Sequence, residues 1–175
     1  GTPDTARRER IACDGVVMSV GWAPAAALLY QSGARMRYDT ATEQFVPAQL
    51  PAGMFAAGRV NGVHELEARI DDGTRAGTDA ARHAGRDVPA FDISIPVETS
   101  PPSHPWPIVA HPSGKNFVDF DEDLHLADFE NAAQEGFDNI ELMKRFTTVG
   151  MGPSQGKHSN MNAIRILARL RGASP

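Results

Sequence analysis

The chain has 175 residues, of which 41% are hydrophobic and 22% are charged, a composition typical of folded globular protein and not of a disordered tail. The net charge of −5 and the scattered arginines give no basic face, so we expect no nucleic-acid partner. No apolar run approaches the roughly 18 residues that cross a bilayer, and Cys13 is the only cysteine, so we expect a cytoplasmic protein with no membrane contact and no thiolate metal cluster within the chain.

The first half of the chain alternates between strand and helix patterns. The apolar, β-branched run at residues 13–20 predicts a buried strand, and residues 25–32 predict a short helix. Residues 35–46 predict a hairpin with its turn at Asp39 and Thr40. This order of elements favours an α/β domain.

A second buried strand is predicted at residues 54–58, followed by a turn and a long helix over residues 65–84. Gly73 and Gly77 lie inside that helix, where each glycine costs about 1 kcal/mol relative to alanine. We therefore expect another backbone to approach the helix closely there, as a helix against a cofactor-binding sheet would require.

The turn between this strand and this helix, Gly58–Gly62, has the sequence GRVNG. Free backbone amides in such a turn, at a helix N-terminus, are suited to a phosphate or ribose contact. Similar glycine turns end many strands that bind nothing, and both interpretations stay open. No Gly-x-Gly-x-x-Gly turn follows an apolar strand, so we expect only the C-terminal part of a dinucleotide-binding domain, at residues 1–96, and poor dinucleotide binding by this part alone.

A proline-rich connector is predicted at residues 97–115, and a small helical domain at residues 116–175. In the latter we expect a short strand at residues 117–120 and helices around residues 126–133 and 137–143. A final helix, capped by Ser159, carries an apolar stripe and ends at Gly172. The fold class is thus α/β followed by α.

The loop GMGPSQGKHS in the helical domain resembles a family of [2Fe–2S] modules. That family places two cysteines before the first helix and two more around a Gly-Pro-Cys-Gln-Gly loop. Aligned on this motif, Asp119 and Asp121 replace the first pair, and Ser154 and Ser159 replace the second. Hydroxyls and isolated carboxylates do not substitute for thiolates on iron–sulfur. The resemblance therefore implies a module that kept its scaffold without a cluster.

The longer string FDNIELMKRFTTVGMGPSQGKHS, with NFVDFDEDL before it, resembles the α subunits of heterotetrameric sarcosine oxidases over essentially the whole chain. The segment VGWAP, followed by MFAAG, also resembles the C-terminal end of flavin-dependent disulfide-reductase-like domains. Those domains carry an aspartate after the glycine where this chain has Arg59, so NAD is expected at this site and not a flavin. The residues expected to contact NAD are Gly58, Arg59, Asn61, Gly62, His64 and Leu66.

The resemblance implies a subunit of an enzyme that oxidises the N-methyl group of sarcosine to give glycine, hydrogen peroxide and a one-carbon unit for tetrahydrofolate. FAD and FMN would be held mainly by the β subunit, with γ and δ subunits completing the complex. Lys144 and Thr147 could contact a flavin phosphate across the α–β interface, or form a solvated helix face. We assign no catalytic residue to this chain. The alternatives are an α subunit of a related amine or opine dehydrogenase complex, and a non-catalytic docking module.

Other constellations point to ordinary surfaces. The acidic residues between Asp119 and Asp123 lack the glycine and glutamate spacing of a calcium loop. No two histidines have the i, i+4 spacing of a zinc-binding helix, and no Gly-x-Ser-x-Gly elbow surrounds Ser154. We therefore expect neither a metal site nor a hydrolase.

Overall fold

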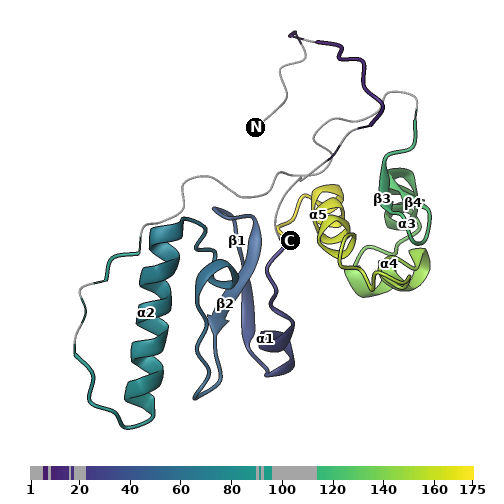
Figure 1. Cartoon of the computed structure of the whole chain (residues 1–175). Helices are drawn as coiled ribbons and strands as arrows, with labels where there is room; N and C mark the ends of the chain where they lie inside the picture. The colour runs from purple at the N-terminus through teal and green to yellow at the C-terminus, as the bar shows by residue number, and fades with distance from the viewer. Residues whose placement is uncertain are drawn as a thin grey trace. The chain divides into compact units, whose positions relative to one another are not determined.

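The computed structural model describes residues 6–7, 9–15, 17, 23–89, 91, 93–95 and 114–175. The chain divides into two compact units, one formed by Asp14–His104 and the other by Pro105–Pro175 together with Gly1–Cys13 (Figure 1). Among the described residues, no helix combines the length and apolar character that crossing a membrane requires. The predicted connector at residues 97–115 lies outside the described residues except for its last two positions.

The first unit places a β-hairpin between two helices (Figure 1). Its elements are α1 (Ala27–Gln31), β1 (Arg35–Asp39), β2 (Gln44–Gln49), the 3-10 turn η1 (Gly58–Asn61) and α2 (Leu66–His83). The two strands are antiparallel with Tyr38 opposite Phe45, and the rings of these two residues meet edge to face at 5.3 Å. The hairpin is therefore confirmed, although its turn covers residues 40–43 and its second strand extends to Gln49.

The predicted strand at residues 54–58 is wrong in its pairing. The backbone is extended at Ala57, with φ −146° and ψ 157°, but the segment has no strand partner among the described residues. A strand needs a neighbour to complete its hydrogen bonds, and the apolar pattern alone does not reveal whether one is present. The predicted strand at residues 13–20 is likewise absent from residues 13–15 and 17, and its remaining positions lie outside the described residues.

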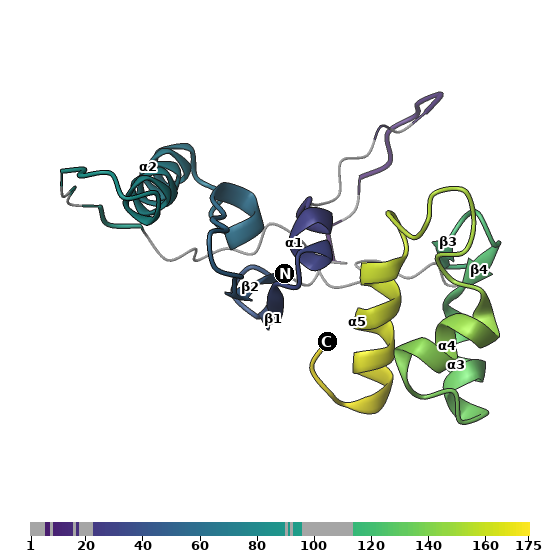
Figure 2. The ribbon, with the colours of Figure 1, turned by 90° about the horizontal axis from the view of Figure 1, so that it is seen from below.

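The second unit is a three-helix cluster with a small hairpin, seen from below in Figure 2. Its elements are β3 (Phe117–Asp119), β4 (Leu124–His125), α3 (Leu126–Gln134), α4 (Ile140–Thr147) and α5 (Asn160–Arg171). All three predicted helices are confirmed. The amide of Asn139 was not singled out from the sequence, yet its side-chain oxygen accepts from the backbone N–H groups of Glu141 and Leu142 and so begins α4.

One apolar core holds the three helices together. Helix α3 contributes Phe129 and Ala132, α4 contributes Met143, and α5 contributes Ala163; each of these side chains is fully buried. Val118 from β3 packs into the same core and joins the small hairpin to the helices. This core positions the loop between α4 and α5 against the β3–β4 turn.

The core assignment predicts that alanine substitutions of two phenylalanines in this unit will lower stability by very different amounts. Phe129→Ala should lower the free energy of unfolding by about 3 to 5 kcal/mol, because it empties a fully buried site. Phe120→Ala removes a ring that is 81% exposed and should change stability by about 0.5 kcal/mol or less. Urea denaturation of both variants measures the difference, and equal losses would contradict this core assignment.

Candidate functional site

The GRVNG turn is organised by a buried carboxylate from α2. Asp72 is 2% exposed, and its Oδ2 accepts hydrogen bonds from the backbone N–H of Gly58 at 2.7 Å and from the side-chain amide of Asn61 at 3.0 Å. Arg75 donates to the other oxygen of Asp72 at 2.7 and 3.0 Å and to the carbonyl of Ala56 at 3.1 Å. The charge of Asp72 is therefore compensated inside the fold.

The other side of the turn rests on β2. The side-chain amide of Gln44 donates to the carbonyl of Arg59 at 2.9 Å. Gly62 has a φ of +81°, and a Cβ placed there would lie 3.2 to 3.4 Å from Thr42 and Val46. A side chain at this position would thus be both strained and crowded.

This geometry differs from the predicted phosphate cradle in two respects. The Gly58 amide donates to Asp72 and is not free, and α2 begins at Leu66, four residues after the turn ends. The predicted residues do lie close together in the chain, because Gly58, Arg59 and Asn61 form η1 and His64 and Leu66 follow directly. Arg59 is itself part of this turn, and its side chain is half-buried.

A second buried carboxylate organises the loop between α4 and α5. Asp119 is 2% exposed, and its Oδ2 accepts from the hydroxyl of Ser159 at 2.7 Å and from the backbone N–H of Gly150 at 2.9 Å. Its Oδ1 accepts from the backbone N–H groups of Asp121 and Glu122 at 2.9 and 3.3 Å. Ser159 does precede α5 as predicted, but its hydroxyl binds Asp119 and does not cap the helix.

The remaining two positions aligned with the cysteines also meet. Asp121 accepts at its Oδ2 from the backbone N–H of Ser154 at 2.8 Å. A Cβ at Gly152 would collide with the side chain of Asp121. Each of the two aspartates therefore accepts a hydrogen bond from one of the two serines.

The glycines of the loop make room for one side chain of α5. A Cβ at either Gly150 or Gly156 would collide with Asn160, and both glycines have a φ near +75°, at +75° and +74°. Thr148 ends α4 in the left-handed region, and its hydroxyl donates to Glu122 at 2.9 Å. The loop is thus held by side chains from the β3–β4 turn and from α5.

Burial and hydrogen bonding shift the pKa of the Asp119 carboxyl group in opposite directions. Burial raises the pKa of its carboxyl group, because a low-dielectric surrounding disfavours the charged form. The hydrogen bonds from Gly150, Ser159, Glu122 and Asp121 favour the carboxylate, and together they lower the pKa below that of an ordinary aspartate. Asp119 is therefore a fixed negative charge at neutral pH.

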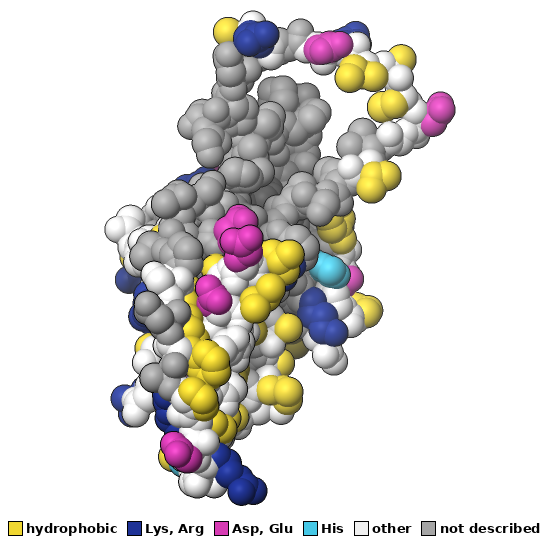
Figure 3. Space-filling model, turned by 60° about the vertical axis from the view of Figure 1, so that its left-hand side comes forward, with side chains coloured by type: hydrophobic (Ala, Val, Ile, Leu, Met, Phe, Trp, Pro, Cys, Tyr) yellow, Lys and Arg dark blue, Asp and Glu magenta, His cyan; other side chains and the backbone are white. Residues whose placement is uncertain are grey.

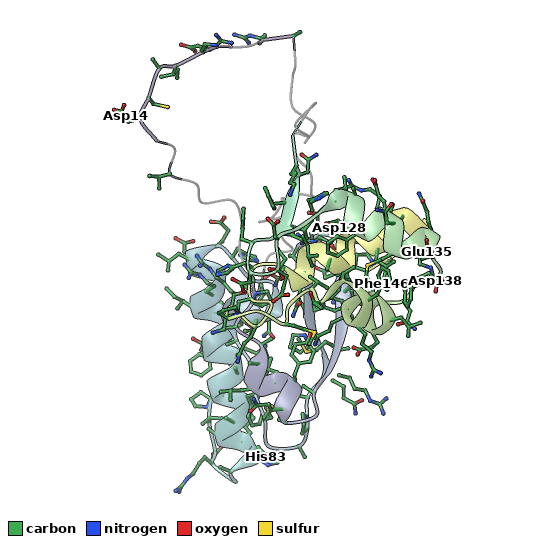
Figure 4. The ribbon with its side chains drawn as sticks, turned by 90° about the vertical axis from the view of Figure 1, so that its right-hand side faces the viewer. Asp14, His83, Asp128, Glu135, Asp138 and Phe146 are labelled. Carbon is green, nitrogen blue, oxygen red and sulfur yellow. The ribbon has the colours of Figure 1, made fainter. Side chains whose placement is uncertain are left out.

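The predicted flavin contacts lie on α4. Lys144 is exposed in the last turn of the helix. Thr147 is buried, and its hydroxyl donates to the carbonyl of Met143 at 2.8 Å. Thr147 also lines a groove of about 410 Å³ between α3 and α4, around which Figure 4 labels Asp128, Glu135 and Phe146.

Neither organising carboxylate was predicted to have its role. Asp72 was not singled out, because an aspartate within a helix usually signals a solvated face. The only available signal was its position in the second turn of the helix that follows the GRVNG segment. Among the described residues, no group of three or more histidine, cysteine, aspartate or glutamate side chains could hold a metal ion.

The Asp119 network predicts a pH-dependent contribution to stability. At neutral pH, Asp119→Asn should lower the free energy of unfolding by about 2 to 3 kcal/mol, because an NH2 group replaces one acceptor oxygen and faces buried donors. The folded pKa is depressed, so this contribution is complete above the ordinary aspartate pKa of about 3.9. It is lost as the pH falls through that value toward the folded pKa.

Urea denaturation of the parent chain and the variant, at neutral pH and in steps below pH 5, measures this effect. The control is Asp123→Asn, since the Asp123 side chain is 77% exposed and its nearest ion-pair partner is Lys115 at 3.6 Å. That variant should change stability by at most about 0.5 kcal/mol. A similar loss in both variants would contradict a special role for Asp119.

Comparison with known proteins points to one family. Residues 113–175 match the family model of the sarcosine oxidase A3 domain. The chain is 34% identical over 172 residues to the sarcosine oxidase subunit alpha of Rhizobium meliloti (strain 1021), covering 97% of this chain and 17% of that protein. It is 26% identical over 172 residues to the subunit alpha of Corynebacterium sp. (strain P-1), covering 94% of this chain and 18% of that protein.

A solved structure shares the fold. The crystal structure of L-proline dehydrogenase from P. horikoshii superposes with a TM-score of 0.62 and 18% identity, covering 87% of this chain and 33% of that one. At this identity the likeness shows the fold alone. The sequence matches extend over both units of the chain, and the chain therefore belongs to the family of sarcosine oxidase α subunits, of whose curated members it spans 17 to 18%.

Proposed function

We propose that this chain is a structural, NAD-binding part of the α subunit of a cytoplasmic complex that oxidises sarcosine. The reaction yields glycine, hydrogen peroxide and a one-carbon unit that passes to tetrahydrofolate elsewhere in the complex. The observation that carries the proposal is the Asp119 network, because it gives the helical unit a scaffolding role in place of a redox one. The similarity to sarcosine oxidase α subunits supports sarcosine as the substrate in this proposal.

In this proposal Asp119, at the position of one cysteine ligand, has a structural role and binds no cluster. Iron–sulfur clusters are anionic and are stabilised by hydrogen bonds to their sulfur atoms. In this chain the N–H of Gly150 and the hydroxyl of Ser159 point at a carboxylate. A fixed carboxylate satisfies the same kind of donors without carrying electrons. Electron transfer then belongs to FAD and FMN, held mainly by the β subunit.

In this proposal the first unit contacts NAD mainly with side chains and less with backbone amides. Arg59 can pair with a phosphate, and cations are suited to that contact. The amide of Gly58 is occupied by Asp72, so that donor is not available to the cofactor. The role of this unit is to hold the dinucleotide, and the hydride acceptor is the flavin of the partner.

A docking role for the second unit is also supported by a specific observation. Four of its large apolar side chains are between 43% and 81% exposed: Phe120, Leu142, Phe146 and Met151. Leu142 and Phe146 lie one turn apart on the same side of α4, while Lys144 lies on a different side of this helix. We propose that the side with Leu142 and Phe146, together with the loop that follows, contacts the β subunit. Lys144 and Thr147, on other sides of the same helix, would then lie near a flavin phosphate.

The NAD assignment predicts the effect of charge at one position. In the complete α subunit, Arg59→Glu should weaken NAD binding by about tenfold to a hundredfold, corresponding to loss of a charge-assisted contact of about 1.4 to 2.8 kcal/mol. Arg59→Lys should retain most of the affinity. Arg82→Glu, at the far end of α2, removes a cation that is 47% exposed and serves as the control. Equal affinity in all variants, by calorimetric titration, would refute the contact.

The overall function is tested on the assembled complex. The complete α subunit, purified with its partner subunits, should be yellow and should form peroxide when given sarcosine. L-proline is the comparison substrate, because a proline dehydrogenase shares the fold. Stoichiometric acid-labile sulfide bound to residues 114–175, or turnover of proline in preference to sarcosine, would overturn the proposal.

A further inference from the structure

Helix α2 has two sides that carry apolar residues, and the described residues of its own unit cover only one of them. Ala68, Asp72 and Ala76 are buried and face η1. At 100° per residue, a second line of residues runs along a different side of the helix, centred about 130° away from Asp72. This open face of α2 consists of Leu66, Ile70, Gly73, Gly77, Ala80 and Ala81.

The open face has the composition of an interior surface. It contains no charged residue, although the rest of the helix carries charges at Glu67, Arg69 and Arg82, among others. Leu66 is 62% exposed and Ile70 is 61% exposed. Figure 3 shows hydrophobic side chains gathered along this side of the first unit.

The two glycines make the open face flat. A Cβ at Gly73 or Gly77 would meet no atom within 4 Å, so the close approach expected from the sequence is not supplied by the described residues. Both glycines nevertheless weaken an 18-residue helix, each by about 1 kcal/mol relative to alanine. The side chains of Leu66 and Ile70, with the flat surface at Gly73 and Gly77, allow another apolar element to pack closely against α2.

We propose that the open face of α2 is covered by an uncharged, apolar element of the same α subunit, from the polypeptide outside these 175 residues. The curated α subunits are far longer, since this chain spans 17 to 18% of them, and the solved chain of the same fold is about three times the matched part. The extended segment at residues 54–57 likewise has no strand partner among the described residues. This inference rests on the family assignment within the proposed function.

Thiol labelling of the complete α subunit tests this contact. In a Cys13→Ser background, the Ile70→Cys variant of the complete subunit should react about 100-fold more slowly with a maleimide than the same variant of the 175-residue chain, because labelling requires local opening. Glu67→Cys, exposed on the same helix but off the open face, is the matched control and should react rapidly in both. A Gly77→Leu variant of the complete subunit should also lose thermal stability.

Each other outcome overturns the proposal. Rapid labelling of the Ile70→Cys variant in the complete subunit means that the face is solvated. Protection that appears only when partner subunits are added means that another subunit covers it. Protection in the 175-residue chain that grows with its concentration means that a second copy covers it. Sarcosine turnover is measured separately, so loss of that activity would refute the proposed function without bearing on this contact.

Discussion

The structure depends on buried carboxylates that are satisfied by the main chain. A buried charge is costly unless hydrogen bonds or an opposite charge compensate it. Asp119 collects donors from two segments distant in sequence, and thereby fixes the loop between α4 and α5 to the β3–β4 turn. Asp72 does the same for the GRVNG turn, with help from Arg75. In each unit, one aspartate determines the shape of the segment that sequence motifs identify.

Regular elements of this chain follow from local patterns. Gly136 follows the C-cap residue of α3, and Gly172 is the C-cap residue of α5; both glycines have a positive φ, as residues that close a helix commonly do. The hairpin was predictable because alternation and turn residues act within a few positions. Residues 54–57 were not, because pairing depends on a neighbour that the local sequence does not contain.

The candidate sites show the same division. The proximity of positions 119, 121, 154 and 159 was implied by a family resemblance, and the structure joins them in two pairs. The direction of each hydrogen bond was not predictable, because it depends on which donors the folded loop turns inward. The Gly58 amide illustrates this, since a turn that suggests a free donor has that donor engaged by Asp72.

The mutual fit of Asp119 and its loop also limits which single substitutions this chain tolerates. Replacing Ser159 alone by cysteine would exchange a strong hydroxyl donor for a weak thiol donor, while the Asp119 carboxylate stays in position. Replacing Asp119 alone by cysteine would remove the carboxylate that accepts from the Gly150 amide and the Ser159 hydroxyl. Each of these single changes is therefore expected to give a less stable protein. The two side chains are energetically coupled, so a change at either one alters the environment of the other.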